Sequence, residues 1–232
     1  MQHMKGEIFH ILNRGVEKRK IFFAEKDRFR FAYNLQDFNN TKEALPYPRR
    51  CQLREREGRT VGHRTSYNMG EKLVTLLCWS FLPNHVHNLV QEKIDGGASV
   101  FSKKIFGGYT KYINELYDRS GVLFQGGSKI IRVTKDPHFD YLPFYIMANP
   151  IELIEPGWRE GGIKSPEKVM DFLENYRWSS LPDLIGKENF PGIVNKDLFY
   201  ELFGTNEKKF KDDFIGWLKG YERGTGLPGF ID

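Results

Sequence analysis

The chain has 232 residues, and 40% of them are hydrophobic, which is enough to build a globular core. Its formal net charge of +5 and pI near 9.0 suit a polyanionic partner. The two cysteines, Cys51 and Cys78, exclude a framework of disulfides and a cysteine-based zinc site. The first residues lack an apolar signal core, and no run reaches the roughly 18 to 20 apolar residues of a membrane span. We therefore expect a cytoplasmic protein with no membrane partner.

The first elements are predicted by two different periodicities. Residues 6–15 alternate around Ile8, His10 and Leu12, which predicts a strand that ends at Gly15. Residues 25–40 repeat their apolar side chains at helical spacing, with acidic residues near the start, which predicts the first helix.

Residues 41–70 have no hydrophobic pattern and account for most of the chain's net positive charge. They contain seven basic and three acidic residues, a net charge of +4. We predict a polar loop or arm, either solvated or in contact with nucleic acid. The charged residues are Lys42, Arg49, Arg50, Arg54, Arg56, Arg59, Arg64, Glu43, Glu55 and Glu57.

Two short apolar runs follow, residues 71–82 and 85–92. They are rich in β-formers and are separated by Pro83 and Asn84, which predicts an antiparallel hairpin with His85 opening its second strand.

A second helix is predicted over residues 99–121, although Gly107 and Gly108 weaken it. Residues 129–134 predict a fourth strand, and a third helix follows with Asp136 as N-cap and Pro137 at its first position.

The order strand, helix, strand, strand, helix, strand predicts the α+β class. It is typical of a ferredoxin-like (RRM-like) fold, one antiparallel sheet with helices on one face. The third helix, which contains Tyr145, lies outside that core as an extra element. Residues 182–232 are expected to form a C-terminal helical extension with an amphipathic segment near 210–218.

The segment "SFLPNHVHNLV" places two histidines two positions apart on a strand. Alternate side chains of a strand point to the same face, so His85 and His87 project together while Val86 points away. The pair could be a satisfied core pair, a structural metal clip, or half of a catalytic metal site that binds a divalent transition metal.

Tyr145 and Asn149 are four residues apart and share one face of the third helix. One could bind a metal while the other attacks a substrate. A set of two imidazoles and an amide oxygen favours a labile Mg²⁺ or Mn²⁺ and predicts phosphoryl transfer. A tyrosine hydroxyl, with a pKa near ~10, needs a metal or a base to act as a nucleophile. Rival nucleophiles are Tyr109, Tyr112, Tyr117 and Tyr141.

Four segments in the same order resemble one family. "LPNHVHNLV" resembles the histidine–hydrophobic–histidine (HUH) motif of single-tyrosine transposases, and "YIMANP" resembles their Tyr-Ile-x-x-Asn-Pro motif. Between them, "YTKYINELYDRSGVLFQGGSKIIRV" is similar to a segment of the branch associated with repetitive extragenic palindromes, and "NYRWSSL" is similar to a later Trp-Ser-Ser element. The resemblance runs from about Phe9 to Leu181.

This resemblance implies a metal site of His85, His87 and Asn149, with Tyr145 as nucleophile. It implies cleavage of single-stranded DNA next to a hairpin, through a 5′-phosphotyrosine and a free 3′-hydroxyl that can rejoin the strand without ATP. The implied catalytic domain covers residues 1–181, with the basic insertion at 41–70.

The candidate DNA contacts are basic residues near the expected site. They are Arg14, Lys103, Lys104, Lys111, Lys129 and Arg132. Two other functions stay open: a domesticated hairpin-binding protein that no longer cuts, and a metal-dependent nuclease in which the histidines activate water. The sequence allows both a monomer and a homodimer.

Overall fold

The structure is a computed structural model that describes residues 6–43, 47–56, 58, 70–134 and 137–221. Its centre is one antiparallel sheet of four strands in the order β2-β3-β1-β4. This order confirms the predicted ferredoxin-like α+β fold. The strands are β1 (Ile8–Arg14), β2 (Val74–Phe81), β3 (His85–Glu92) and β4 (Lys129–Val133).

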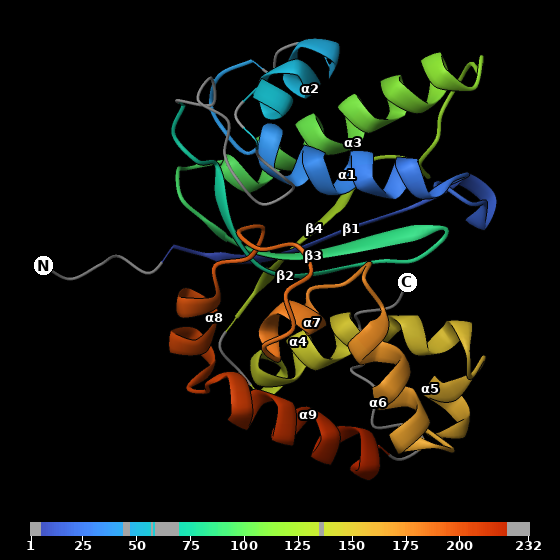
Figure 1. Ribbon diagram of the computed structural model, residues 1–232, viewed down its shortest axis with the longest axis vertical. Helices are drawn as coiled ribbons and strands as arrows, with labels where there is room; N and C mark the ends of the chain where they lie inside the picture. The colour runs from blue at the N-terminus through green and yellow to red at the C-terminus, as the bar shows by residue number, and fades with distance from the viewer. Residues whose placement is uncertain (1–5, 44–46, 57, 59–69, 135–136, 222–232) are drawn as a thin grey trace, which may run out of the picture.

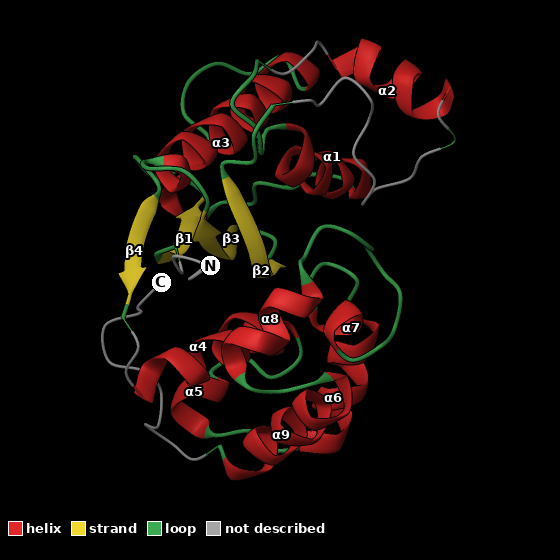
Figure 2. Cartoon of the chain, turned by 90° about the vertical axis from the view of Figure 1, so that its left-hand side faces the viewer, coloured by secondary structure: helices red, strands yellow, loops and turns green. Residues whose placement is uncertain are grey.

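Helices α1 (Glu25–Asp37) and α3 (Gly97–Leu116) cover one face of the sheet (Figures 1 and 2). Helix α1 begins where Asp27 Oδ2 accepts hydrogen bonds from the backbone N of Phe23 and of Ala24, at 2.9 and 2.8 Å. This satisfies amides that have no partner within the helix. Between the helices, the buried rings of Phe31 and Tyr109 meet edge to face at 5.0 Å.

The opposite face is covered by α4 (Pro137–Ala148) together with the C-terminal helices (Figure 2). Phe144 of α4 stacks on Phe210 at a centroid distance of 5.3 Å, which packs the last helix against α4. Helices on both faces explain why every residue of β2 is buried. A short 3-10 helix, η1 (Val16–Lys18), follows β1. The elements after α4 are η2 (Asn149–Leu153), α5 (Trp158–Gly161), α6 (Pro166–Asn175), α7 (Leu181–Leu184), α8 (Lys196–Phe203) and α9 (Glu207–Gly220).

The basic insertion differs from the predicted loop, because helix α2 forms over Tyr47–Arg56. Arg, Gln, Leu and Glu are good helix formers, and their intrinsic preference acts even without an apolar stripe. The rest of the insertion between residues 43 and 70 lies outside the described residues, apart from residue 58, as does the predicted N-cap Asp136. Pro137 is the first residue of α4, as expected. Within the described ranges, no helix is long and apolar enough to span a bilayer.

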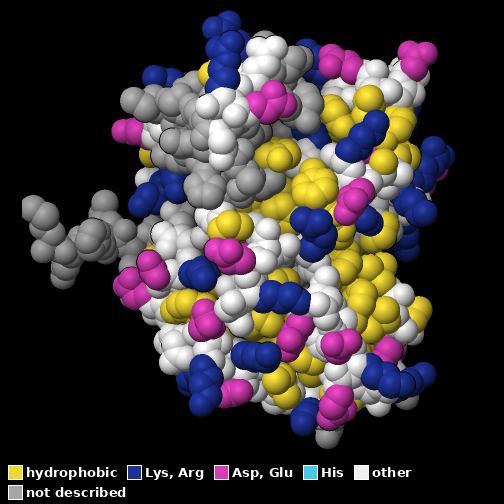
Figure 3. Space-filling view, in the orientation of Figure 1, with side chains coloured by type: hydrophobic (Ala, Val, Ile, Leu, Met, Phe, Trp, Pro, Cys, Tyr) yellow, Lys and Arg dark blue, Asp and Glu magenta, His cyan; other side chains and the backbone are white. Residues whose placement is uncertain are grey.

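Charged side chains on the face shown in Figure 3 are interspersed, with Lys and Arg next to Asp and Glu. The net positive charge therefore does not form one continuous patch on this face.

Candidate active site

His85 and His87 project from β3 toward the face that α4 covers. Their ring centroids are 5.0 Å apart, and their planes are nearly perpendicular at 80°. Both side chains are buried, and the Nε2 atom of each is shielded from solvent. The strand therefore brings the two imidazoles together, as the alternation of β3 predicted.

Tyr145 of α4 lies next to this pair. Its ring meets the His87 ring edge to face, with centroids 6.4 Å apart and planes at 90°. The tyrosine is itself buried, with 6% of its surface exposed. Strand β3 and helix α4 are separated by more than forty residues, so only the packing of α4 on the sheet produces this contact.

The orientation of His85 is determined by Asn84 in the hairpin turn. Asn84 Nδ2 donates a hydrogen bond to the backbone carbonyl of Lys18 at 3.0 Å, so its Oδ1 faces His85 Nδ1 at 2.7 Å. An amide oxygen can only accept, which places the imidazole proton on Nδ1 of His85. Its Nε2 then has the lone pair that a metal ligand requires.

His10 has the same place beside His87 that Asn84 has beside His85, and no motif of the sequence indicated it. His10 Nε2 is 3.0 Å from His87 Nδ1, and the two rings are stacked at 5.2 Å. The alternation of Ile8, His10 and Leu12 did place His10 on one face of β1. Leu12 lies directly opposite His87 in the sheet, so Leu12 and His87 share a face, and His10 lies on that face too.

Asn149 is fully buried at the start of η2, directly after α4, and both ends of its side-chain amide form hydrogen bonds. Its Nδ2 donates to the carbonyl oxygens of Tyr145 and Ile146 at 2.8 and 3.3 Å. Its Oδ1 accepts from Nη2 of Arg159 at 2.6 Å. The oxygen predicted to bind a metal therefore faces a guanidinium.

These contacts show which of the three predicted metal ligands could bind a cation. The imidazoles of His85 and His87 fit a divalent transition metal, since imidazole is a suitable ligand and both rings have orienting partners. Asn149 does not fit in this arrangement, because a cation at Oδ1 would meet the positive charge of Arg159. In the described part of the chain, no three His, Cys, Asp or Glu side chains are arranged to hold a metal ion.

Arg159 of α5 was also not anticipated from the sequence. Its guanidinium carbon lies 5.5 Å from the ring centroid of Tyr145 and 4.9 Å from that of Trp158. Nη1 forms an ion pair with Glu152 Oε2 at 3.4 Å. No motif of the sequence indicated this residue, because its position depends on how η2 and α5 fold back on α4.

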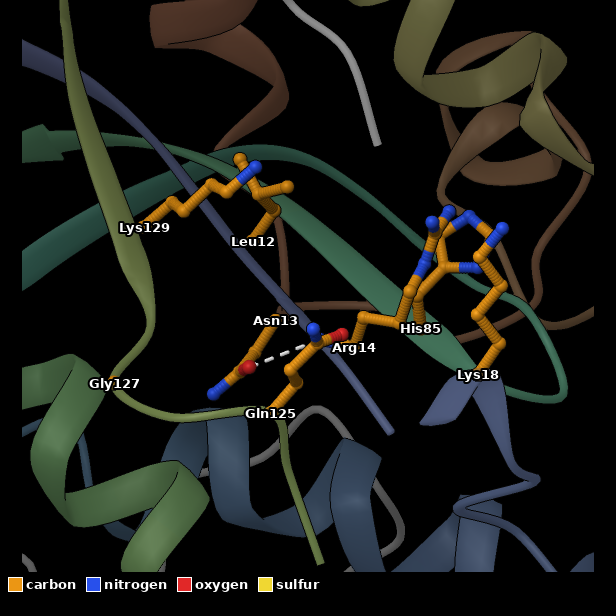
Figure 4. A pocket seen from close by; sticks show the side chains of 8 residues that line it. All are labelled: Leu12, Asn13, Arg14, Lys18, His85, Gln125, Gly127 and Lys129. Atoms are coloured by element: carbon orange, nitrogen blue, oxygen red, sulfur yellow. Dashed lines mark hydrogen bonds between the residues drawn. The ribbon is translucent and has the colours of Figure 1, made fainter. Parts of the chain in front are cut away.

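A cavity of about 310 Å³ opens beside His85 (Figure 4). Three basic side chains reach it: Arg14 and Lys18 on the side of His85, and Lys129 on the other side. Lys18 and its neighbour Glu17 have positive φ angles of 59° and 53°, an uncommon conformation for residues other than glycine. The remaining lining residues are Leu12, Asn13, Gln125 and Gly127.

Of the six predicted DNA contacts, only Arg14 and Lys129 lie at this cavity. In the strand register Arg132 lies opposite Phe9, whereas Lys129 lies opposite Leu12. Phe9 and Leu12 are three residues apart and point to opposite faces of the sheet. The side chain of Arg132 therefore points away from the cavity, where it forms an ion pair with Glu7.

The other three predicted contacts are on α3. Lys104 Nζ donates to the carbonyl oxygens of Asn40 and Lys42, both at 2.6 Å, and burial lowers its pKa. Lys104 therefore anchors the chain at the start of the insertion. Lys111 pairs with Glu115 at 3.7 Å, and Lys103 lines a separate groove along α3.

The rival tyrosines have other structural roles. The hydroxyl of Tyr109 donates to the carbonyl of Ile21 at 2.8 Å, and burial raises its pKa. The hydroxyls of Tyr112 and Tyr117 donate to the carboxylate of Asp27 at 3.2 and 2.8 Å. Burial raises the pKa of Tyr117 to about 12 and that of Tyr141 to about 12. A raised pKa keeps a phenol protonated and weakens it as a nucleophile.

The fold and the site together define an α+β protein with a ferredoxin-like sheet, in which two histidines of a strand meet a tyrosine of a covering helix. No family model matches the chain, and no curated protein matches its sequence. One similar solved structure is that of a REP-associated tyrosine transposase bound to a REP hairpin. The identity is 14%, the match covers 84% of this chain and 88% of that chain, and the TM-score is 0.45.

Proposed function

We propose that this protein cuts and rejoins single-stranded DNA next to a hairpin, with Tyr145 as the nucleophile. The observation that supports this most directly is the contact of Tyr145 with His87, which sits beside His85. A tyrosine alone is a poor nucleophile at neutral pH, so its place beside two potential metal ligands matters.

The proposed reaction exchanges one phosphodiester for another. Oη of Tyr145 forms a bond to phosphorus while the bond from phosphorus to the 3′-oxygen breaks. The phenol loses a proton and the departing 3′-oxygen gains one, which leaves a 5′-phosphotyrosine and a 3′-hydroxyl. Attack by a 3′-hydroxyl on the phosphotyrosine reverses the exchange, so the reaction needs no ATP.

The side chains of this protein would hold the metal and the DNA. Nε2 of His85 and Nε2 of His87 would bind Mg²⁺ or Mn²⁺, which polarises a bound phosphate. Arg14, Lys18 and Lys129 would bind neighbouring phosphates of the strand at the cavity.

The test is incubation of the protein with a pool of labelled single-stranded hairpins and Mn²⁺ or Mg²⁺, followed by denaturing electrophoresis. We expect a protein–DNA adduct that is absent from Tyr145→Phe. Tyr141→Phe is the matched control, since Tyr141 lies one turn earlier on the same helix, and this variant should keep the adduct.

Other outcomes identify the alternative functions. Binding under native conditions with no adduct in the unmodified protein would indicate a domesticated hairpin-binding protein. Multiple turnovers with a free 5′-phosphate, retained in Tyr145→Phe, would indicate a nuclease that activates water. An adduct that persists in Tyr145→Phe would place the nucleophile at another residue.

A further inference from the structure

Arg159 is held against the tyrosine by contacts on several sides. Its guanidinium packs against the rings of Tyr145 and Trp158, and Nη2 donates to Asn149 Oδ1 at 2.6 Å. Trp158 is 1% exposed, so the guanidinium rests on a fixed aromatic surface. A planar, permanently charged group in such a setting loses little further entropy when it binds an anion.

Asn149 connects this guanidinium to the backbone of the nucleophile. The same amide that accepts from Arg159 donates to the backbone carbonyl of Tyr145 at 2.8 Å. Asn149 is 0% exposed, so water does not compete for these bonds. The three residues therefore form one hydrogen-bonded unit at the end of α4.

We propose that Arg159 binds the phosphate that Tyr145 attacks, and that Asn149 is the positioning residue for Arg159 and not a metal ligand. The inference rests on the proposed function and gives Arg159 and Asn149 their roles beside the two histidines and Tyr145. A guanidinium matches the geometry of a phosphate and stabilises the negative charge that develops on it during transfer.

Glu152 marks the side of the guanidinium on which an anion binds. Its Oε2 lies 3.4 Å from Nη1 of Arg159, and its side chain is 41% exposed, compared with 23% for Arg159. This carboxylate occupies a position suited to a phosphate oxygen. An incoming phosphate would displace it, and removing its charge should make that displacement easier.

The first measurement is Mn²⁺ affinity without DNA, by titration calorimetry. Asn149→Ala and Arg159→Gln should keep the affinity of the unmodified protein, whereas His85→Ala and His87→Ala should lose it. A loss of Mn²⁺ affinity in Asn149→Ala as large as that in His87→Ala would show that Asn149 binds the metal and would overturn its assignment as a positioning residue.

The second measurement is the single-turnover rate of adduct formation and the affinity for a short single strand. Arg159→Gln should lower the rate by about 100-fold, the usual effect of removing one group that stabilises transition-state charge, and Arg159→Lys should recover part of it. Glu152→Gln should bind the strand more tightly than the unmodified protein. Arg177→Gln is the control, since Arg177 also packs on aromatic rings beside a carboxylate, that of Glu25, and its variant should react normally.

Asn149→Ala should lower the rate as Arg159→Gln does, and the double variant should be no slower than either, because both changes remove the same interaction. Equal rates for Arg159→Gln and the unmodified protein would overturn the phosphate role. Urea denaturation of each variant shows whether a lost rate reflects unfolding. If the unmodified protein forms no adduct with any hairpin, the proposed function and the phosphate role fail together, while the Mn²⁺ titration still decides the role of Asn149.

Discussion

His10 and His87 are joined across two strands of the sheet, with Nε2 of His10 3.0 Å from Nδ1 of His87. For His87 to bind a metal through Nε2, its Nδ1 has to carry the proton. Nδ1 then donates the hydrogen bond, and Nε2 of His10 accepts it. The rings are also stacked, with an interplanar angle of 17°, and His10 is 1% exposed. His10 is thus placed to orient His87 from the neighbouring strand.

We therefore expect His10→Ala to lower the affinity for Mn²⁺ by about 10-fold to 100-fold, because loss of an orienting partner frees the ligand to rotate. Titration calorimetry without DNA measures this. His10→Gln offers a side-chain oxygen that can accept the same hydrogen bond, and we expect it to lose less. Unchanged affinity in His10→Ala, together with lost affinity in His87→Ala, would contradict this role.

Lys18 and Lys129 should each contribute to the salt dependence of binding to single-stranded DNA. The slope of log K against log salt is negative, and losing one phosphate contact on a single strand reduces its magnitude by about 0.7. Lys18→Ala and Lys129→Ala should each show that decrease in fluorescence anisotropy titrations over a range of salt. Lys209→Ala, on α9 and paired with Asp213, should keep the original slope; an equal decrease there would mean that binding follows net charge and not the cavity.

The two glycines in the middle of α3 should respond to alanine in opposite directions. A Cβ added at Gly107 would meet no atom within 4 Å, so Gly107→Ala should stabilise the protein by up to about 1 kcal/mol through helix propensity. At Gly108 the Cβ would lie 2.3 Å from the ring of Phe38, which is buried. Gly108→Ala should destabilise the protein by about 1 to 3 kcal/mol, because the ring has to shift. Urea denaturation of both variants is the test, and the same sign for both would be evidence against this packing.

Asp183 should make the stability depend on pH. Burial raises the pKa of its carboxyl, although the carboxyl accepts hydrogen bonds from the backbone N of Asn189 and of Phe190. The native state therefore keeps this proton to a higher pH than the unfolded chain. Above about pH 4 the native state binds more protons, so the free energy of unfolding falls as the pH rises toward the native pKa.

Asp183→Asn removes this contribution. The difference in unfolding free energy between the unmodified protein and Asp183→Asn should favour the unmodified protein most near pH 4 and decrease as the pH rises. Urea denaturation at several pH values between 3.5 and 7 measures it, and a difference that stays constant with pH would refute the assignment.

Local sequence patterns predicted the four strands of the sheet, the two helices on its first face and the side chains that share a face of each element. The alternation of β1 and β3 predicted both strands, and the Pro83–Asn84 turn predicted that His85 opens the second strand of a hairpin. Helical spacing predicted that Tyr145 and Asn149 lie near each other at the end of α4. These features depend on contacts between residues close in the chain, and a local period is enough to predict them.

Which faces meet depends on long-range packing. The register of β1 against β3 brings His10 to His87, which lies 77 residues away in the chain. The return of the chain through α5 brings Arg159 to Asn149, and strand pairing sends Lys129 and Arg132 to opposite faces of the sheet. A period of two or of 3.6 residues specifies the face on which a side chain lies but contains no information about the element that will cover that face. That choice depends on how the buried surfaces of the whole chain pack together.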